Sequence, residues 1–159
     1  MKKSMDLLRC LWLHSWTLII LTSCQKDTHN EPSTTKTKTE LLTSGTWKYT
    51  GAIINPAYDY YGDGTAVTDI FGIMKSCEKD DFEVYKTNGQ WEYNEGPTKC
   101  DPSYPQAFNL PWNLADNETK LILGGIQHTI LELTASTLKL RYTVEDAGLF
   151  YTEEDSYEH

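Results

Sequence analysis

The four cysteines are the residues of this chain with the most chemistry open to them, and their positions divide them into two pairs. Cys10 and Cys24 lie in and directly after an apolar run near the start of the sequence, whereas Cys77 and Cys100 lie far downstream. A cysteine thiol can be acylated, paired in a disulfide, used as a nucleophile or bound to a metal. The residues around each pair indicate which of these uses to expect.

The stretch Leu21-Thr22-Ser23-Cys24 predicts a lipidated cysteine. It follows three basic residues and an apolar run over residues 10–21, which has the length of a signal-peptide core and is too short to span a bilayer. We therefore expect residues 1–23 to be a signal peptide and Cys24 to anchor a bacterial lipoprotein through two or three acyl chains. The alternatives are an uncleaved membrane helix and the signal peptide of a soluble protein.

The expected mature chain is acidic and has the length of one domain. Removing residues 1–23 from the 159 leaves 159 − 23 = 136 residues, and it takes away three basic residues and one acidic residue. The formal charge therefore changes from −9 to −11. This charge repels nucleic acid phosphates and provides no basic patch for anionic lipids. We expect no nucleic-acid partner, and a membrane contact made by the acyl chains alone.

Residues 24–40 have the composition of a flexible tether. Segment 25–40 has one proline as its only apolar residue, so it cannot bury enough surface to offset its ordering entropy. Its first residues, Gln25-Lys26-Asp27 followed by Glu31, resemble the acidic export signal that lipoproteins of Bacteroidota carry after the acylated cysteine. The resemblance implies an outer-membrane lipoprotein displayed on the cell surface. The alternative is an ordinary solvated linker on a domain that faces the periplasm.

Cys77 and Cys100 are the two thiols that remain in the expected mature chain. An exported protein lies in an oxidising compartment where disulfides persist, so we expect these cysteines to pair. Closing a loop of about 24 residues would stabilise the fold by roughly 3 kcal/mol in the chain-entropy account. The alternative is a zinc site, which is disfavoured because neither cysteine belongs to a CxxC pair and no histidine lies nearby in sequence.

Short segments of alternating apolar residues, separated by turn residues, follow residue 40 and predict antiparallel strands. Short helices are expected only within residues 39–44 and 66–75. The dipeptide Asn88-Gly89 suits a type I′ hairpin, and Pro111 indicates a sheet edge or a bulge because it cannot donate to a ladder. Eight strands are expected, at residues 47–54, 82–86, 90–94, 108–114, 119–123, 126–133, 137–144 and 149–153.

Eight short strands in one domain, residues 41–159, fit an all-β fold. We predict an antiparallel up-and-down barrel of eight strands, which removes exposed edges and leaves an interior that can hold one small ligand. A β-sandwich is the alternative, because both architectures bury one face of each strand.

Two motifs in this domain resemble those of lipocalins. Gly45-Thr46-Trp47 is similar to the GxW motif that begins the first lipocalin strand. A second pattern resembles that of the lipocalin-like lipoproteins of Bacteroidota, and it consists of Cys77-Glu78-Lys79-Asp80-Asp81, Asn88-Gly89, Glu95-Gly96 and Lys99-Cys100. The resemblance as a whole extends over about residues 41–145. The resemblance implies a calycin-like barrel on a lipid anchor, in a family whose ligands are largely undefined, and it does not imply an enzyme.

Lipocalins usually place an arginine over the tryptophan of the first strand. Arg141 is the only arginine in the expected mature chain, so it is the candidate to stack on Trp47. Strand alternation favours the other arrangement, because Leu140 and Tyr142 are expected to face inward and Arg141 therefore outward.

Aromatic residues form two candidate contact regions. Alternation places four rings in the barrel interior, at Trp91, Tyr93, Trp112 and Tyr142. A shift of one residue in register would turn each of them outward. Three further rings share one loop, at Tyr58, Tyr60 and Tyr61. The leading hypothesis is a barrel that binds a small apolar or aromatic molecule, and the alternative is a barrel packed solid whose loop binds a protein or glycan.

Catalytic chemistry is poorly represented. The histidines of the expected mature chain, His29, His128 and His159, form no recognisable triad, and no P-loop, HExxH, GxSxG or dinucleotide motif occurs. Asp80 and Asp81 point to opposite faces of an extended segment, which is the wrong geometry for two carboxylates that act on one bond. We expect Asp80 or Asp81 to accept backbone hydrogen bonds beside the disulfide. We predict no catalytic residue, no cofactor and no metal site.

Overall fold

The computed structural model describes residues 35–159. The predicted signal peptide, the lipidation site at Cys24 and most of the tether lie outside the described residues. No helix in the described part is long and apolar enough to cross a membrane.

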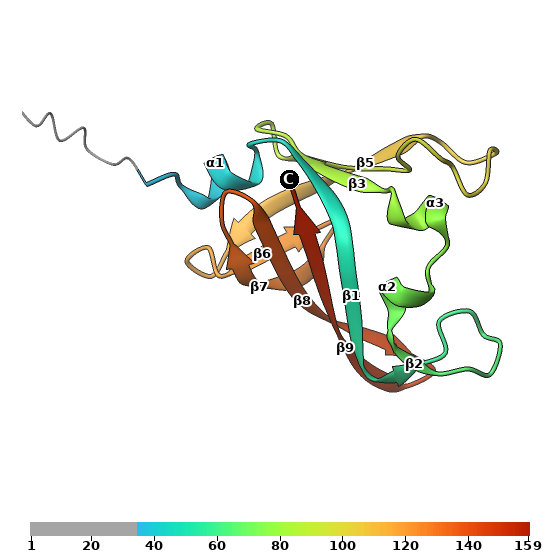
Figure 1. Ribbon diagram of the computed structural model, residues 1–159. Coiled ribbons are helices and arrows are strands. Elements are labelled where there is room, and N and C mark those ends of the chain that lie inside the picture. The colour runs from blue at the N-terminus through green and yellow to red at the C-terminus, as the bar shows by residue number, and fades with distance from the viewer. Residues whose placement is uncertain (1–34) are drawn as a thin grey trace, which may run out of the picture. The chain divides into compact units, whose positions relative to one another are not determined.

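Nine strands and three short helices make up residues 35–159 (Figure 1). The strands are β1 Thr46–Tyr58, β2 Val67–Asp69, β3 Phe82–Tyr85, β4 Gln90–Asn94, β5 Ala107–Ala115, β6 Lys120–Leu123, β7 Ile126–Leu133, β8 Thr137–Asp146 and β9 Leu149–Glu158. The helices are α1 Lys38–Leu42, α2 Ile70–Ile73 and α3 Ser76–Lys79. All eight predicted strands are present, whereas β2 and α3 were not predicted.

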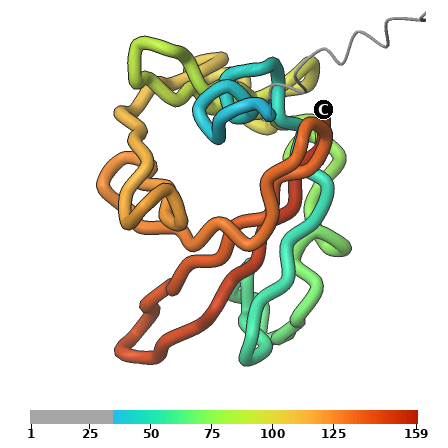
Figure 2. Tube along the Cα trace, turned by 90° about the vertical axis from the view of Figure 1, so that its left-hand side faces the viewer, coloured from blue at the N-terminus to red at the C-terminus, as the bar shows by residue number. Residues whose placement is uncertain are grey.

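Eight of the strands close into an antiparallel barrel. From β3 onward each strand pairs with the next along the chain, and β1 pairs with both β3 and β9. Figure 2 shows this closure as a ring of chain. The short strand β2 pairs with β1 alone. The predicted up-and-down barrel is confirmed, and one continuous closed sheet excludes the sandwich.

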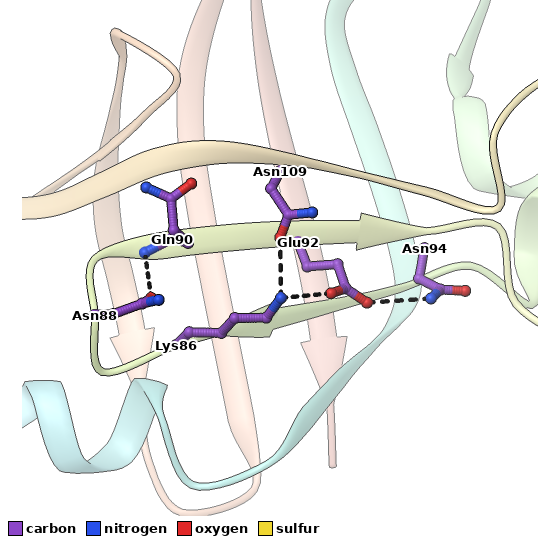
Figure 3. A network of polar contacts seen from close by, with 6 residues as sticks. All are labelled: Lys86, Asn88, Gln90, Glu92, Asn94 and Asn109. Carbon is purple, nitrogen blue, oxygen red and sulfur yellow. Dashed lines mark hydrogen bonds and ion pairs between the residues drawn. The ribbon is translucent and has the colours of Figure 1, made fainter.

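The turn between β3 and β4 differs from the predicted type I′ geometry. That type needs two residues with positive φ, but in this loop only Gly89 has one, at 80°. The Gly89 amide donates to the Lys86 carbonyl at 3.0 Å, and the Asn88 side chain accepts from the Gln90 amide at 3.1 Å (Figure 3). The loop is therefore a type I turn followed by a left-handed glycine, because the Asn88 side chain satisfies the next amide without a left-handed backbone.

Pro111 lies in β5, between β4 and β6, and so not at a sheet edge. It pairs with Gln90 on one side, while on the other side its carbonyl accepts from the Gly124 amide at 2.9 Å. Because β6 ends at Leu123, the missing N–H of Pro111 faces a position just past the end of that strand. The proline is tolerated there without loss of a ladder hydrogen bond.

Apolar side chains fill the end of the barrel next to α1. They include Leu42, Trp47, Tyr85, Trp112, Leu121, Leu138 and Leu140. The Thr37 hydroxyl accepts from the Glu40 amide at 3.1 Å, and the Glu40 carboxylate accepts from the Thr37 amide at 2.7 Å, which caps α1. The buried Trp47 indole N–H donates to the Leu42 carbonyl at 2.9 Å and so joins α1 to β1.

His159, and not Arg141, covers Trp47. The ring centroids of His159 and Trp47 lie 3.8 Å apart, and His159 Nδ1 lies 2.9 Å from the carbonyl oxygen of Thr46. A Cβ atom at Gly45 would lie 3.3 Å from the His159 ring, so the glycine of the GxW motif permits this close approach. Arg141 points outward and donates to Glu154 at 2.6 Å. The favoured outward arrangement is therefore confirmed.

Cys77 in α3 and Cys100 in the connection from β4 to β5 form the predicted disulfide. Their Cα atoms lie 5.2 Å apart, in the usual range for a disulfide. The bond joins a short helix to a loop with little regular structure of its own.

Candidate ligand-binding cavity

A cavity of about 750 Å³ occupies the half of the barrel away from α1. Each of the eight barrel strands contributes to its wall. The region after α2, helix α3, the connection from β4 to β5 and the turn from β6 to β7 also border it. This volume is typical of pockets that hold small organic ligands. The barrel is thus filled by its own side chains at one end and open at the other.

Three of the four rings predicted to line the interior border this cavity, namely Trp91, Tyr93 and Tyr142. Trp112 also points inward, but it lies in the core cluster near α1. Its indole N–H donates to the Lys86 carbonyl at 3.0 Å, and its ring meets Tyr85 edge-on at 5.5 Å. Alternation identified the inward face correctly but could not show the level along the barrel axis at which each ring lies.

The aromatic loop predicted as a separate contact surface lies at the cavity. Tyr58 and Tyr60 belong to its lining, and Tyr58 packs against Tyr151 with ring centroids 4.9 Å apart. Tyr61 is 42% exposed, and its hydroxyl donates to Glu78 at 2.9 Å. The loop therefore forms part of the cavity mouth.

Acidic side chains are the main feature of the cavity that the sequence analysis did not find. Seven carboxylates line it, from Glu78, Asp81, Glu83, Glu95, Asp101, Glu153 and Asp155. The sequence did contain an indication of Glu83, since strand alternation places it on the same inward face as Tyr85. Asp155 lies beyond residue 153, where the last strand was predicted to end.

Glu83 and Asp155 are held deep in the barrel by tyrosine hydroxyls. Tyr85 donates to Glu83 at 2.7 Å, and Tyr49 donates to Asp155 at 3.0 Å. The two acidic residues are 5% and 7% exposed, respectively. Burial raises the pKa of Glu83; at Asp155, burial and then the neighbouring Glu153 charge raise the pKa well above its usual range. Burial therefore shifts both groups toward their protonated forms.

Asp81, directly before β3, has unused hydrogen-bonding capacity. One carboxylate oxygen accepts from the Tyr93 hydroxyl, but Oδ1 is buried without a hydrogen-bond partner. Asp81 is 5% exposed, and burial raises its pKa to about 6. The Trp91 indole N–H, which faces Glu83, is likewise buried without a hydrogen bond of normal geometry. Asp81 therefore keeps a buried acceptor oxygen that no side chain within residues 35–159 satisfies, while the Trp91 N–H is directed at Glu83.

The prediction that Asp80 or Asp81 accepts backbone hydrogen bonds beside the disulfide is wrong. Neither carboxylate accepts one within residues 35–159, and Asp80 Oδ1 is also buried without a partner. Asp81 instead turns into the barrel, because the chain enters β3 at this point and its pairing places odd-numbered residues inward.

Positive side chains compensate carboxylates outside the barrel but not inside it. Three ion pairs of 2.6–2.8 Å lie on the outer face, formed by Lys86 with Glu92, Lys139 with Glu132, and Arg141 with Glu154. Figure 3 shows the first of them, in which Lys86 also donates to Asn109 at 3.0 Å. No lysine or arginine is among the described lining residues. Burial lowers the pKa of His128, which keeps this lining residue neutral at pH 7.

The carboxylates are not arranged to chelate a metal. In the part of the chain that the structure describes, no three His, Cys, Asp or Glu side chains are grouped so that they could hold a metal ion. No model of a known protein family matches the chain, and no curated protein is similar to it in sequence. The likeness to lipocalins therefore rests on the closed barrel and on the short motifs.

Proposed function

We propose that this chain is a lipid-anchored envelope lipoprotein whose lipocalin-like barrel binds a small molecule with an apolar or aromatic body. The observation that carries the proposal is the open cavity of about 750 Å³. Phe108 stacks on Tyr93 with ring centroids 5.0 Å apart and meets Trp91 edge-on at 5.8 Å, so one wall is continuously aromatic. The carboxylates in the lining supply polar groups that can orient a ligand in this cavity.

The alternative function is a surface module that binds a protein or glycan through its loops. It assumes a barrel packed solid and an aromatic loop that is free for contact. The cavity, and the place of Tyr58 and Tyr60 in its lining, support the small-molecule binder instead. We also propose that the chain is not an enzyme.

Filling the cavity is expected to abolish binding of a neutral hydrophobic probe. Val144 lines the cavity from β8, and its neighbour Thr143 is exposed on the outer face of the same strand. Val144→Trp is expected to weaken binding of N-phenyl-1-naphthylamine by about tenfold or more, because the larger ring occupies the ligand volume. A fluorescence titration measures this.

Thr143→Trp is the matched control and is expected to keep the parent affinity. Failure of the parent protein to bind the probe would contradict the proposal. So would parent-like affinity in a folded Val144→Trp variant. Native mass spectrometry of protein purified from its host tests directly for a retained ligand.

The proposed anchor predicts that Cys24→Ala moves the protein from the membrane fraction to the soluble fraction. Alanine has no thiol to form the thioether, so metabolic labelling with a fatty acid is expected to disappear. Cys10→Ala is the matched control, since this cysteine lies within the expected signal peptide and is not acylated. If Cys24→Ala still sediments with membranes, the proposed lipid anchor at Cys24 is wrong. Protease treatment of intact cells tests surface display separately.

A further inference from the structure

We infer that the cavity selects an organic cation: an amine with an aromatic or apolar body, whose ammonium group binds among the buried carboxylates of Asp81, Glu83 and Asp155. This inference rests on the proposed function, since it names the ligand class of the same cavity. Three observations carry it. The lining holds seven carboxylates and no lysine or arginine, and Asp81 Oδ1 is buried without a partner.

The hydrogen bonds of the deep carboxylates leave acceptor sites open. A carboxylate has about four lone-pair positions, whereas Asp81 accepts only from Tyr93 among the described side chains. Glu83 accepts from Tyr85 and is faced by the Trp91 and Tyr157 donors. An ammonium group brings three donors and no acceptor. It therefore matches a set of acceptors that the protein itself does not satisfy.

Charge gives a second reason. Ionising a buried carboxylate is costly unless a cation lies beside it, and the positive side chains that pair with carboxylates all lie on the outer face. Burial instead raises the pKa values of Asp81, Glu83 and Asp155, which favours their protonated forms. A bound ammonium would replace those protons, so binding should release them.

The remaining lining shows why the cation is organic. The described residues contain no cluster that could hold a metal ion, and the cavity is far larger than a single ion needs. The rings of Trp91, Tyr93 and Phe108 form an aromatic wall of the same cavity, and the Tyr93 hydroxyl donates to Asp81. Such rings attract both aromatic ligand bodies and the positive charge of an amine.

Three probes with one shared ring system test this inference. Tryptamine carries an ammonium group, tryptophol is its neutral counterpart, and indole-3-acetate is its anionic counterpart. Isothermal titration calorimetry of residues 24–159 is expected to show tryptamine binding about tenfold or more tighter than tryptophol, with no detectable binding of indole-3-acetate. Equal affinity for tryptamine and tryptophol would overturn the inference.

Two substitutions that remove charge and keep shape test the assigned groups. Glu83→Gln and Asp155→Asn are each expected to reduce tryptamine affinity about tenfold or more and to leave tryptophol affinity unchanged. Glu154→Gln is the matched control, because Glu154 adjoins Asp155 on β9 but pairs with Arg141 outside the barrel. Unchanged tryptamine affinity in both cavity variants would overturn the assignment.

The melting temperature is the check that Glu83→Gln folds. A carboxyl group whose pKa is higher in the folded state binds more protons there than in the unfolded state. Its contribution to stability therefore falls as the pH rises from the unfolded pKa through the folded pKa. Burial raises the pKa of Glu83. Glu83→Gln is therefore expected to raise the melting temperature at about pH 7.5 and to leave it unchanged at about pH 4.

The pH dependence of binding is a further test. The titratable groups around Glu83 and Asp155 are Asp81, Glu153, Tyr49, Tyr60, Tyr85, Tyr93, Tyr142, Tyr157 and, from β7, His128. Because the carboxyl pKa values are raised, tryptamine affinity is expected to increase from about pH 5.5 to about pH 8, with proton release. Tryptamine affinity that is independent of pH would contradict the replacement of carboxyl protons by the bound ammonium group.

The outcomes separate the inference from the proposed function. If N-phenyl-1-naphthylamine binds but tryptamine binds no tighter than tryptophol, the selectivity for a cation is wrong and the cavity remains a binding site. Failure of every probe to bind overturns both.

Discussion

Trp47→Ala is expected to lower the free energy of unfolding by about 3–5 kcal/mol. The side chain is fully buried in the core next to α1, and its indole N–H donates to the Leu42 carbonyl at 2.9 Å. Alanine would leave a cavity beneath α1 and deprive a helix carbonyl of its partner. Since domains of this size are stable by about 5–15 kcal/mol, the variant would lose a large share of its stability.

Trp47→Phe separates the two contributions. Phenylalanine keeps an aromatic ring in the core but cannot donate to Leu42, so a smaller loss of about 1–3 kcal/mol is expected. Urea unfolding followed by circular dichroism measures both variants. A loss in Trp47→Ala no greater than that in Trp47→Phe would contradict the packing role assigned to this ring.

Removal of the disulfide is expected to cost roughly 3 kcal/mol. Cys77 and Cys100 are 23 residues apart in sequence, and the bond restricts the unfolded chain over that length. The double substitution Cys77→Ser, Cys100→Ser removes this restriction and also frees α3 from the connection between β4 and β5. The denaturant midpoint of the double variant should fall accordingly.

Reduction of the parent protein provides the control for that substitution. With dithiothreitol the parent should unfold at the midpoint of the untreated double variant, and the double variant should not respond to the reductant. Equal midpoints for the oxidised and reduced parent would show that the bond contributes nothing to stability.

Strand positions were predictable because alternation in this chain is strong where one face of the sheet is buried. Leu138 and Leu140 are fully buried, while the alternate residues Lys139 and Arg141 pair with acidic residues outside. A pattern of this kind fixes register, since a shift by one residue would bury the charges. Barrel closure was predicted from the number of short strands in one domain.

The acidic site was not predictable in the same way, because its residues break the pattern that identified the strands. The second half of β9 carries Glu153, Glu154 and Asp155 in succession, and an acidic run of this kind is typical of a solvated loop. The strand nevertheless continues to Glu158, because β1 and β8 both pair with it. Neighbouring strands overrode local composition, which sequence reasoning on one segment does not capture.

The seam between β1 and β9 determines when the barrel can form. Lys48 pairs with Glu158 and Asn55 with Thr152, so strands from opposite ends of the domain sequence lie side by side. Such pairing requires the chain to close almost the whole domain as a loop first, which places folding on a time scale of about milliseconds to seconds. Until β9 arrives, β1 and β8 present unpaired edges to other chains. Closure of this one seam therefore ends the period in which the new chain is most prone to aggregation.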